Sequence, residues 1–306
     1  MKKELSLTTK VPRTRFNGNV SAHRVFDGRS FSLDEIRAVK GRVDGATVND
    51  VMVSVCGGAL RRYLESKGEL PKESLVAMAP VTARPDAMRK SAGNMVSTMS
   101  LPVRSDIADP MERLRAVHAE SERCKKLTRT VGASLLAEAA HFMPSTTSGL
   151  IANAYGRYGL AKRLPPIFNT VVTNVPGPNF PLYSMGSRMV ANFGLGPIAH
   201  GLGLFQPLLG YNGQITVSAV SCREMMPDPE FYCDGLVESF EALKKAALRP
   251  KAGRSKKAAK KPRSAPAKTN GSGRPAGTRK TANKKTNKKT ASKRATRKRA
   301  SKPARD

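Results

Sequence analysis

The 306-residue chain has no tryptophan, few aromatic residues and four isolated cysteines. Cys56, Cys124, Cys222 and Cys233 form no CxxC pair, so the sequence indicates neither a zinc site nor a disulfide framework. Reduced thiols of this kind fit an intracellular, cytoplasmic compartment. No uncharged apolar run reaches the roughly 18 residues of a transmembrane helix, and the first residues lack the apolar segment of a signal peptide. Any membrane contact is therefore expected to be peripheral.

Acidic residues are scarce, since 23 Asp and Glu stand against 54 Lys and Arg, for a formal net charge of +31. The imbalance is greatest in residues 251–306, which hold 22 Lys and Arg and a single acid, Asp306. This segment has no Val, Ile, Leu, Met, Phe, Tyr or Cys, so it cannot bury enough apolar surface to offset the chain entropy lost on ordering. We predict a disordered N-terminus over residues 1–11, a globular domain over 12–250 and a disordered basic tail over 251–306.

The basic tail is predicted to bind polyanions. Closely spaced cations attract nucleic-acid phosphates through counterion release and anionic lipid surfaces by about 1 kcal/mol per Lys or Arg. The tail resembles the Lys/Ala/Pro-rich tails of histone-like proteins, and it has no aromatic residue to stack on bases, so binding to nucleic acid would not depend on sequence. The polyanion is either nucleic acid or an anionic membrane or lipid-droplet surface; a charge run that only aids solubility is the other interpretation. The most densely basic positions are Lys284, Lys285, Lys288, Lys289, Lys293, Arg294, Arg297, Lys298 and Arg299.

Helix and strand signals alternate along the globular domain, which predicts an α/β fold with a mixed sheet and flanking helices. Ser32 starts a capping box, and Thr47 precedes a helix that Gly68 is expected to end. Asp109 and Asp228 each precede a proline, a pattern typical of helix starts. Strands are expected near 20–26 and over 75–80, 94–103, 168–174, 188–193 and 214–222, with further helices over 133–142 and 148–160.

Two short motifs are candidates for a functional site. Asn49 and Asp50 fall in the first turn of the helix after Thr47, where an amide and a carboxylate can satisfy free N–H groups and complement the helix dipole. We interpret them as capping residues, with a direct role in shaping a site as the alternative. The run Asn174-Val175-Pro176-Gly177-Pro178 predicts a sharp strand exit, because Pro fixes φ and Gly relieves steric conflict. That turn is either purely structural or lines a substrate channel.

Several stretches occur in an order that resembles one known family. They are TRFN (14–17), ATVNDVMVSVCGGALR (46–61), APVTAR (79–84), DPMERL (109–114), TNVPGP (173–178) and PLY (181–183). Across residues 12–248 the chain resembles the C-terminal half of the wax ester synthase/diacylglycerol acyltransferase family. The resemblance implies a fold like that of the CoA-dependent acyltransferases of the chloramphenicol acetyltransferase type. It also implies no bound cofactor, acyl-CoA as co-substrate, and diacylglycerol or a long-chain alcohol as acceptor, giving triacylglycerol or wax ester.

The catalytic motif of that family is missing from these 306 residues. The resemblance places HHxxxDG in the N-terminal half, where the second His is the general base on the acceptor hydroxyl. The histidines here are His23, His118, His141 and His200, and none are adjacent. His23 and Asp27 match HxxxDG, but their neighbourhood resembles the start of the C-terminal half. We interpret that match as structural or coincidental, and a catalytic His23 is the alternative.

Two functional hypotheses follow. In the first, the chain is an acyltransferase half that is inactive alone or needs an N-terminal partner half. In the second, it is a non-catalytic lipid-binding or interaction module that its polyanion-binding tail localises. They differ in whether a complete site with a reactive His can form.

Overall fold

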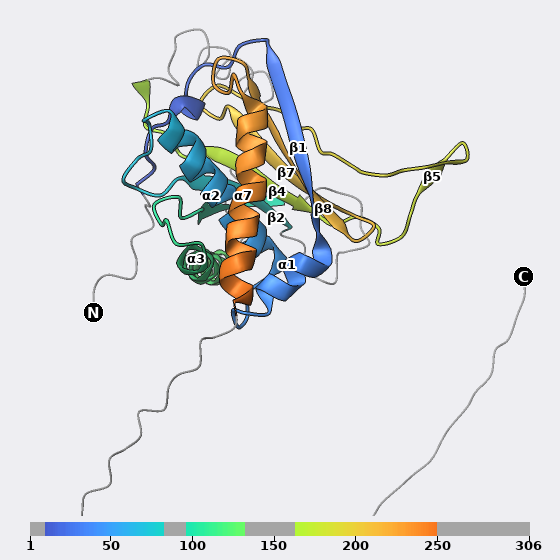
Figure 1. The fold of residues 1–306 in the computed structure, drawn as a ribbon. Helices are drawn as coiled ribbons and strands as arrows, with labels where there is room; N and C mark the ends of the chain where they lie inside the picture. The colour runs from blue at the N-terminus through green and yellow to red at the C-terminus, as the bar shows by residue number, and fades with distance from the viewer. Residues whose placement is uncertain (1–9, 83–95, 132–162, 250–306) are drawn as a thin grey trace, which may run out of the picture. The chain divides into compact units, whose positions relative to one another are not determined.

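The computed structural model describes residues 10–82, 96–131 and 163–249 (Figure 1). Their main sheet has six strands, arranged in the order β1-β8-β7-β4-β2-β3. The neighbours β7, β4 and β2 run parallel to one another, and the remaining pairs are antiparallel. The expected α/β fold with a mixed sheet is thus confirmed. The strands are β1 (Arg24–Ser32), β2 (Val76–Thr82), β3 (Val96–Pro102), β4 (Thr170–Val175), β7 (Leu204–Tyr211) and β8 (Gln214–Cys222).

Helices flank this sheet, and the core lies between the two layers. The helices are α1 (Leu33–Lys40), α2 (Val48–Ser66), α3 (Pro110–Val131) and α7 (Pro229–Leu248). Figure 1 shows α2 and α7 side by side in front of the sheet. Apolar side chains of both helices, such as Val51, Val55, Leu236 and Phe240, are buried in one cluster with those of the strands. Across the described ranges, no helix combines the length and apolarity that crossing a bilayer requires.

Local capping explains where α1 and α3 begin. The side chain of Ser32 accepts a hydrogen bond from the Glu35 amide over 3.5 Å, and that of Asp109 accepts one from the Glu112 amide over 2.7 Å. These starts confirm the sequence prediction, because a cap is satisfied by residues only three positions away. Asp228 precedes α7 as expected, but its side chain makes no capping bond and instead accepts from the Tyr63 hydroxyl over 2.7 Å.

Three strand predictions need correction. The strand expected near 20–26 begins only at Arg24 and continues to Ser32 as β1. The segment predicted as a strand over 188–193 contributes only Arg188, the last residue of β6 (Ser187–Arg188), which pairs with Tyr183–Ser184 (β5) outside the main sheet. The central strand β7 was missed, because Pro207 and glycines argue against a central strand. Pro207 is tolerated because the ladder between β7 and β8 pairs Phe205 with Val220 and Leu208 with Val217 around it. The helices predicted over 133–142 and 148–160 lie outside the described residues.

The TRFN segment anchors the N-terminal part of the domain through Asn17, which is 1% exposed. Its Nδ2 donates to the carbonyls of Phe168 and Gly201 over 2.8 and 2.9 Å. Its Oδ1 accepts from the Thr14 amide over 3.1 Å and from Asn169 Nδ2 over 2.9 Å. One buried side chain therefore joins three segments that are far apart in the sequence.

All four cysteines are free and buried. Burial raises the pKa of the Cys56 and Cys233 thiols to about 12. Because the thiolate is the reactive form, we expect the native chain to react with Ellman's reagent far more slowly than the unfolded chain. The measurement is the rate of thiol release with and without denaturant. Rapid reaction of the native chain would contradict this burial.

Candidate functional site

The N-terminus of α2 meets the end of β4, and this junction brings two predicted site motifs together. Nδ2 of Asn174, near the end of β4, donates to Oδ1 of Asn49 in the first turn of α2 over 3.4 Å. The contact joins residues 125 positions apart in the chain. β4 lies between two parallel neighbours, and ligands of α/β proteins commonly bind beyond the carboxyl ends of such strands. The junction of α2 and β4 is therefore the candidate site.

Asp50 lies next to this contact and is fully buried. Its Oδ2 accepts from the Thr47 amide over 2.9 Å, while the Asp50 amide donates to Thr47 Oγ1 over 3.1 Å. This reciprocal pair is a capping box. Asp50 therefore has the geometry of the expected capping residue, although the cap does not account for all its contacts.

His118 of α3 is the residue at this site that sequence reasoning missed. Its Nδ1 lies 3.0 Å from Asp50 Oδ2, and its side chain is 18% exposed. Its Nε2 lies beside Gly45, where φ is +75° and an added Cβ would approach Nε2 to 3.3 Å. A carboxylate bonded to Nδ1 holds an imidazole in one orientation. No local signal could have shown this pair, because 68 positions separate its members.

Asp50 also carries an unused acceptor. Among the described residues, its Oδ1 is buried and has no hydrogen-bond partner. A buried carboxylate is costly unless it is paired and hydrogen-bonded. The contacts of Oδ2 with His118 and with the helix start therefore have to compensate much of that cost.

His23 and Asp27 are not brought together in the structure. His23 is exposed and directly precedes β1, and four residues of extended strand span about 13 Å. The Asp27 carboxylate accepts from Arg29 Nη1 over 2.8 Å, and Arg29 Nη2 donates to Asp234 of α7 over 2.7 Å. These contacts give Asp27 a structural partner and favour the structural interpretation of the HxxxDG match.

The Pro176-Gly177-Pro178 turn carries the chain away from the sheet. The carbonyl of Pro178 accepts from the Asn212 amide over 2.9 Å. The backbone of Gly177 packs so closely on the Gly210 carbonyl that an added Cβ would clash with it. These contacts give the turn a structural role, and a role in lining a channel stays a prediction.

Beyond the turn, residues 179–195 form what we call the apolar arm. It includes the β5–β6 hairpin and extends away from the main sheet (Figure 1). Met185 at its tip is fully exposed, and other large apolar side chains of the arm are exposed as well. These are Phe180, Leu182, Tyr183, Val190, Phe193 and Leu195.

The remaining candidate residues belong to other parts of the chain. His141 and the basic positions Lys284, Lys285, Lys288, Lys289, Lys293, Arg294, Arg297, Lys298 and Arg299 lie outside the described residues.

Replacing the two motif residues of α2 is expected to act mainly on stability. Asp50→Ala removes the capping acceptor and the partner of His118, so we expect the free energy of unfolding to fall by about 2 kcal/mol. Asn49→Ala should cost less, because its side-chain contact with Asn174 is long. Denaturant unfolding of each variant is the measurement. If both variants have the parent's free energy of unfolding but lose ligand binding, Asn49 and Asp50 act directly in the site and not as capping residues.

Comparison with known proteins identifies relatives in the family that the sequence motifs resemble. A family model described as the WS/DGAT C-terminal domain matches residues 92–244, half of the chain. A second model, the wax ester synthase/diacylglycerol acyltransferase catalytic domain, matches residues 1–52. A Mycobacterium tuberculosis protein named as a diacylglycerol O-acyltransferase is 34% identical over 233 residues, covering 76% of this chain and 46% of that protein. Another from the same organism, with a name of the same kind, is 34% identical over 248 residues, covering 80% and 53%.

A solved structure shows the same fold. The wax ester synthase/diacylglycerol acyltransferase from Marinobacter aquaeolei VT8 matches with a TM-score of 0.59 and 30% identity. The match covers 78% of this chain and 52% of that one. The chain thus spans about half the length of the curated relatives that it matches.

Proposed function

The chain belongs to the wax ester synthase/diacylglycerol acyltransferase family, and we propose that it supplies the C-terminal half of an O-acyltransfer site. In the proposed reaction the thioester bond of acyl-CoA breaks and the acceptor oxygen forms the new ester. The acceptor hydroxyl gives its proton to the general base, which passes it to the departing CoA thiolate, so that CoA leaves as the free thiol. The acceptor is diacylglycerol or a long-chain alcohol, the product triacylglycerol or wax ester, and acyl-CoA is a co-substrate rather than a bound cofactor.

The observation that carries this proposal is the contact between Asn49 and Asn174. Each belongs to a stretch that resembles the family, and they meet at the carboxyl end of β4. Asp50, which follows Asn49 in the chain, pairs with His118 and fixes the start of α2. A rigid helix terminus is a suitable support for a site that has to hold reacting groups in fixed geometry.

The general base is proposed to come from a separate HHxxxDG-bearing half. His118 is poorly suited to the role, because its Nδ1 is engaged by Asp50 and its Nε2 faces the backbone of Gly45. His23 is exposed and directly precedes β1, at the end of the sheet opposite the α2–β4 junction. Exposed apolar surface on the apolar arm supports contact with such a half, since patches of this kind mark protein interfaces.

The test is acyl transfer from acyl-CoA to hexadecanol or diacylglycerol. The assay is run with the chain alone and with the chain mixed with a polypeptide that carries HHxxxDG. Product formed only by the mixture supports the half-site. If neither forms product while the chain still binds lipid, the alternative applies, a non-catalytic lipid-binding or interaction module.

We further propose that residues 251–306 bind a polyanion, either nucleic acid or an anionic membrane or lipid-droplet surface. The support is their charge, 22 Lys and Arg against one acid. Binding of the whole chain to duplex DNA and to anionic vesicles should weaken steeply with added salt. A chain ending at Pro250 should bind either one far more weakly. Equal binding by the shortened chain, or binding that ignores salt, would contradict the proposal.

A further inference from the structure

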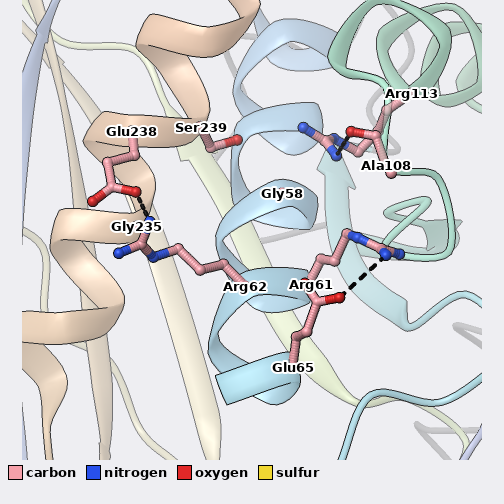
Figure 2. A pocket seen from close by; sticks show the side chains of 9 residues that line it. All are labelled: Gly58, Arg61, Arg62, Glu65, Ala108, Arg113, Gly235, Glu238 and Ser239. Carbon is pink, nitrogen blue, oxygen red and sulfur yellow. Dashed lines mark hydrogen bonds and ion pairs between the residues drawn. The ribbon is translucent and has the colours of Figure 1, made fainter.

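A pocket with a volume of about 180 Å³ lies between the middle of α2, α7 and the start of α3 (Figure 2). Its wall carries three arginines and two glutamates. Both glutamates have partners: Arg62 pairs with Glu238, and Arg61 Nη2 lies 3.5 Å from Glu65 Oε1. The third arginine, Arg113, has no carboxylate partner among the described residues. The pocket therefore has one more positive charge than it can neutralise.

Arg113 is only 4% exposed, and its donors are incompletely used. Nε donates to the Ser54 carbonyl over 3.1 Å and Nη1 to the Ile107 carbonyl over 2.8 Å. Nη1 also donates to the Ala108 carbonyl over 3.4 Å, and all three acceptors are neutral. Burial and then the charge of Arg61 lower the pKa of Arg113 to about 10, and Asp109 offsets this only in part. A buried charge of this kind is normally paired.

A second unpartnered group points to the same place. Ser239 of α7 is 8% exposed, and its buried Oγ has no hydrogen-bond partner among the described residues. Figure 2 shows this hydroxyl and the Arg113 guanidinium directed toward one another above Gly58. A Cβ on residue 58 would clash with Ser239 Oγ and lie 2.6 Å from Arg113 Nη2. Glycine therefore keeps open the space on which the two groups converge.

We propose that this pocket binds a small oxyanion of the phosphate class, held by Arg113 Nη2 and Ser239 Oγ with Arg61 and Arg62 at the rim. A guanidinium nitrogen and a hydroxyl can both donate, so the ligand has to be an acceptor. Arginine forks match the oxygens of phosphate and make strong charge-assisted hydrogen bonds with them. Two sources share this chemistry, free inorganic phosphate and the phosphomonoester end of a larger molecule. The site does not depend on the proposed acyl-transfer role.

The experiment measures the affinity of the full-length chain for inorganic phosphate by calorimetry. It also compares the thermal unfolding midpoint in phosphate with that in sodium chloride of equal ionic strength. We expect phosphate to raise the midpoint. Ser239→Ala should weaken binding by about tenfold, the effect of one hydrogen bond to a charged group, and Arg113→Gln should abolish it. Arg115→Gln is the matched control, because it removes the same charge from an exposed position of α3.

Glycerol 3-phosphate serves as the second probe, and tighter binding of this ester than of inorganic phosphate assigns the pocket to a phosphomonoester. Ser239→Ala keeps the test decisive even if Arg113→Gln does not fold, because the lost hydroxyl has no partner among the residues that the structure describes. The proposal is overturned if phosphate leaves the midpoint unchanged. It is also overturned if Ser239→Ala binds phosphate like the parent and Arg115→Gln, because the anion then resides on other basic residues of the chain.

Discussion

Acyl transfer is expected to rise by about 10²–10⁴-fold when the chain is combined with a polypeptide that carries HHxxxDG, because general-base catalysis typically contributes that factor. The chain alone has no adjacent histidines, and its described histidines are engaged or lie away from the α2–β4 junction. Initial rates of ester formation, with radiolabelled acyl-CoA and hexadecanol, give the ratio directly.

The matched control for this rate is His23→Ala in both the isolated chain and the mixture. We expect it to change neither rate, because His23 is exposed and Asp27 is bound to Arg29. Robust turnover by the isolated chain that His23→Ala abolishes would show that the HxxxDG match is catalytic. The half-site proposal would then be wrong.

Asn17→Ala is expected to lower the free energy of unfolding by about 3 kcal/mol, the largest effect anticipated for a single side chain of the fold. The substitution removes the hydrogen bonds that Asn17 Nδ2 donates to the carbonyls of Phe168 and Gly201. It also removes the acceptor of the Thr14 amide and of Asn169 Nδ2. Each buried polar group left unsatisfied costs about 1–3 kcal/mol. Local relaxation of the structure reduces the total cost of these groups.

Urea unfolding of Asn17→Ala and of Asn179→Ala provides the measurement. Asn179 is exposed, so the same chemical change there should shift stability by less than about 0.5 kcal/mol. Equal midpoints for the two variants would show that the Asn17 network does not stabilise the domain.

The fold class was predictable because its signals are local. Ser32, Thr47 and Asp109 satisfy amides only three positions away, so their capping bonds hold wherever the helices later pack. The strand over Gln214–Cys222 likewise has the predicted bounds, since its apolar alternation is a property of the segment itself. The order of motifs also identified the family, which the comparisons confirm.

Tertiary structure determined where the central strand β7 forms and which residues meet at the candidate site. β7 contains Pro207, which is tolerated only through the pairing geometry of its neighbours. Whether 188–193 forms a strand depended on a partner, and that segment lies outside the main sheet. A β-strand needs a neighbour to satisfy its backbone groups, so strand position cannot be settled by local pattern alone.

The sequence by itself determined the family, the helix starts and the absence of an HHxxxDG motif from these residues. Only the tertiary structure paired Asp50 with His118 and Asn49 with Asn174, and only it buried Arg113 without a carboxylate at ion-pair distance among the described residues. The physical reason is the separation along the sequence over which each interaction acts. Capping and periodicity act within one or two turns of chain, whereas these contacts span 68 and 125 positions and exist only because the sheet order brings their elements together.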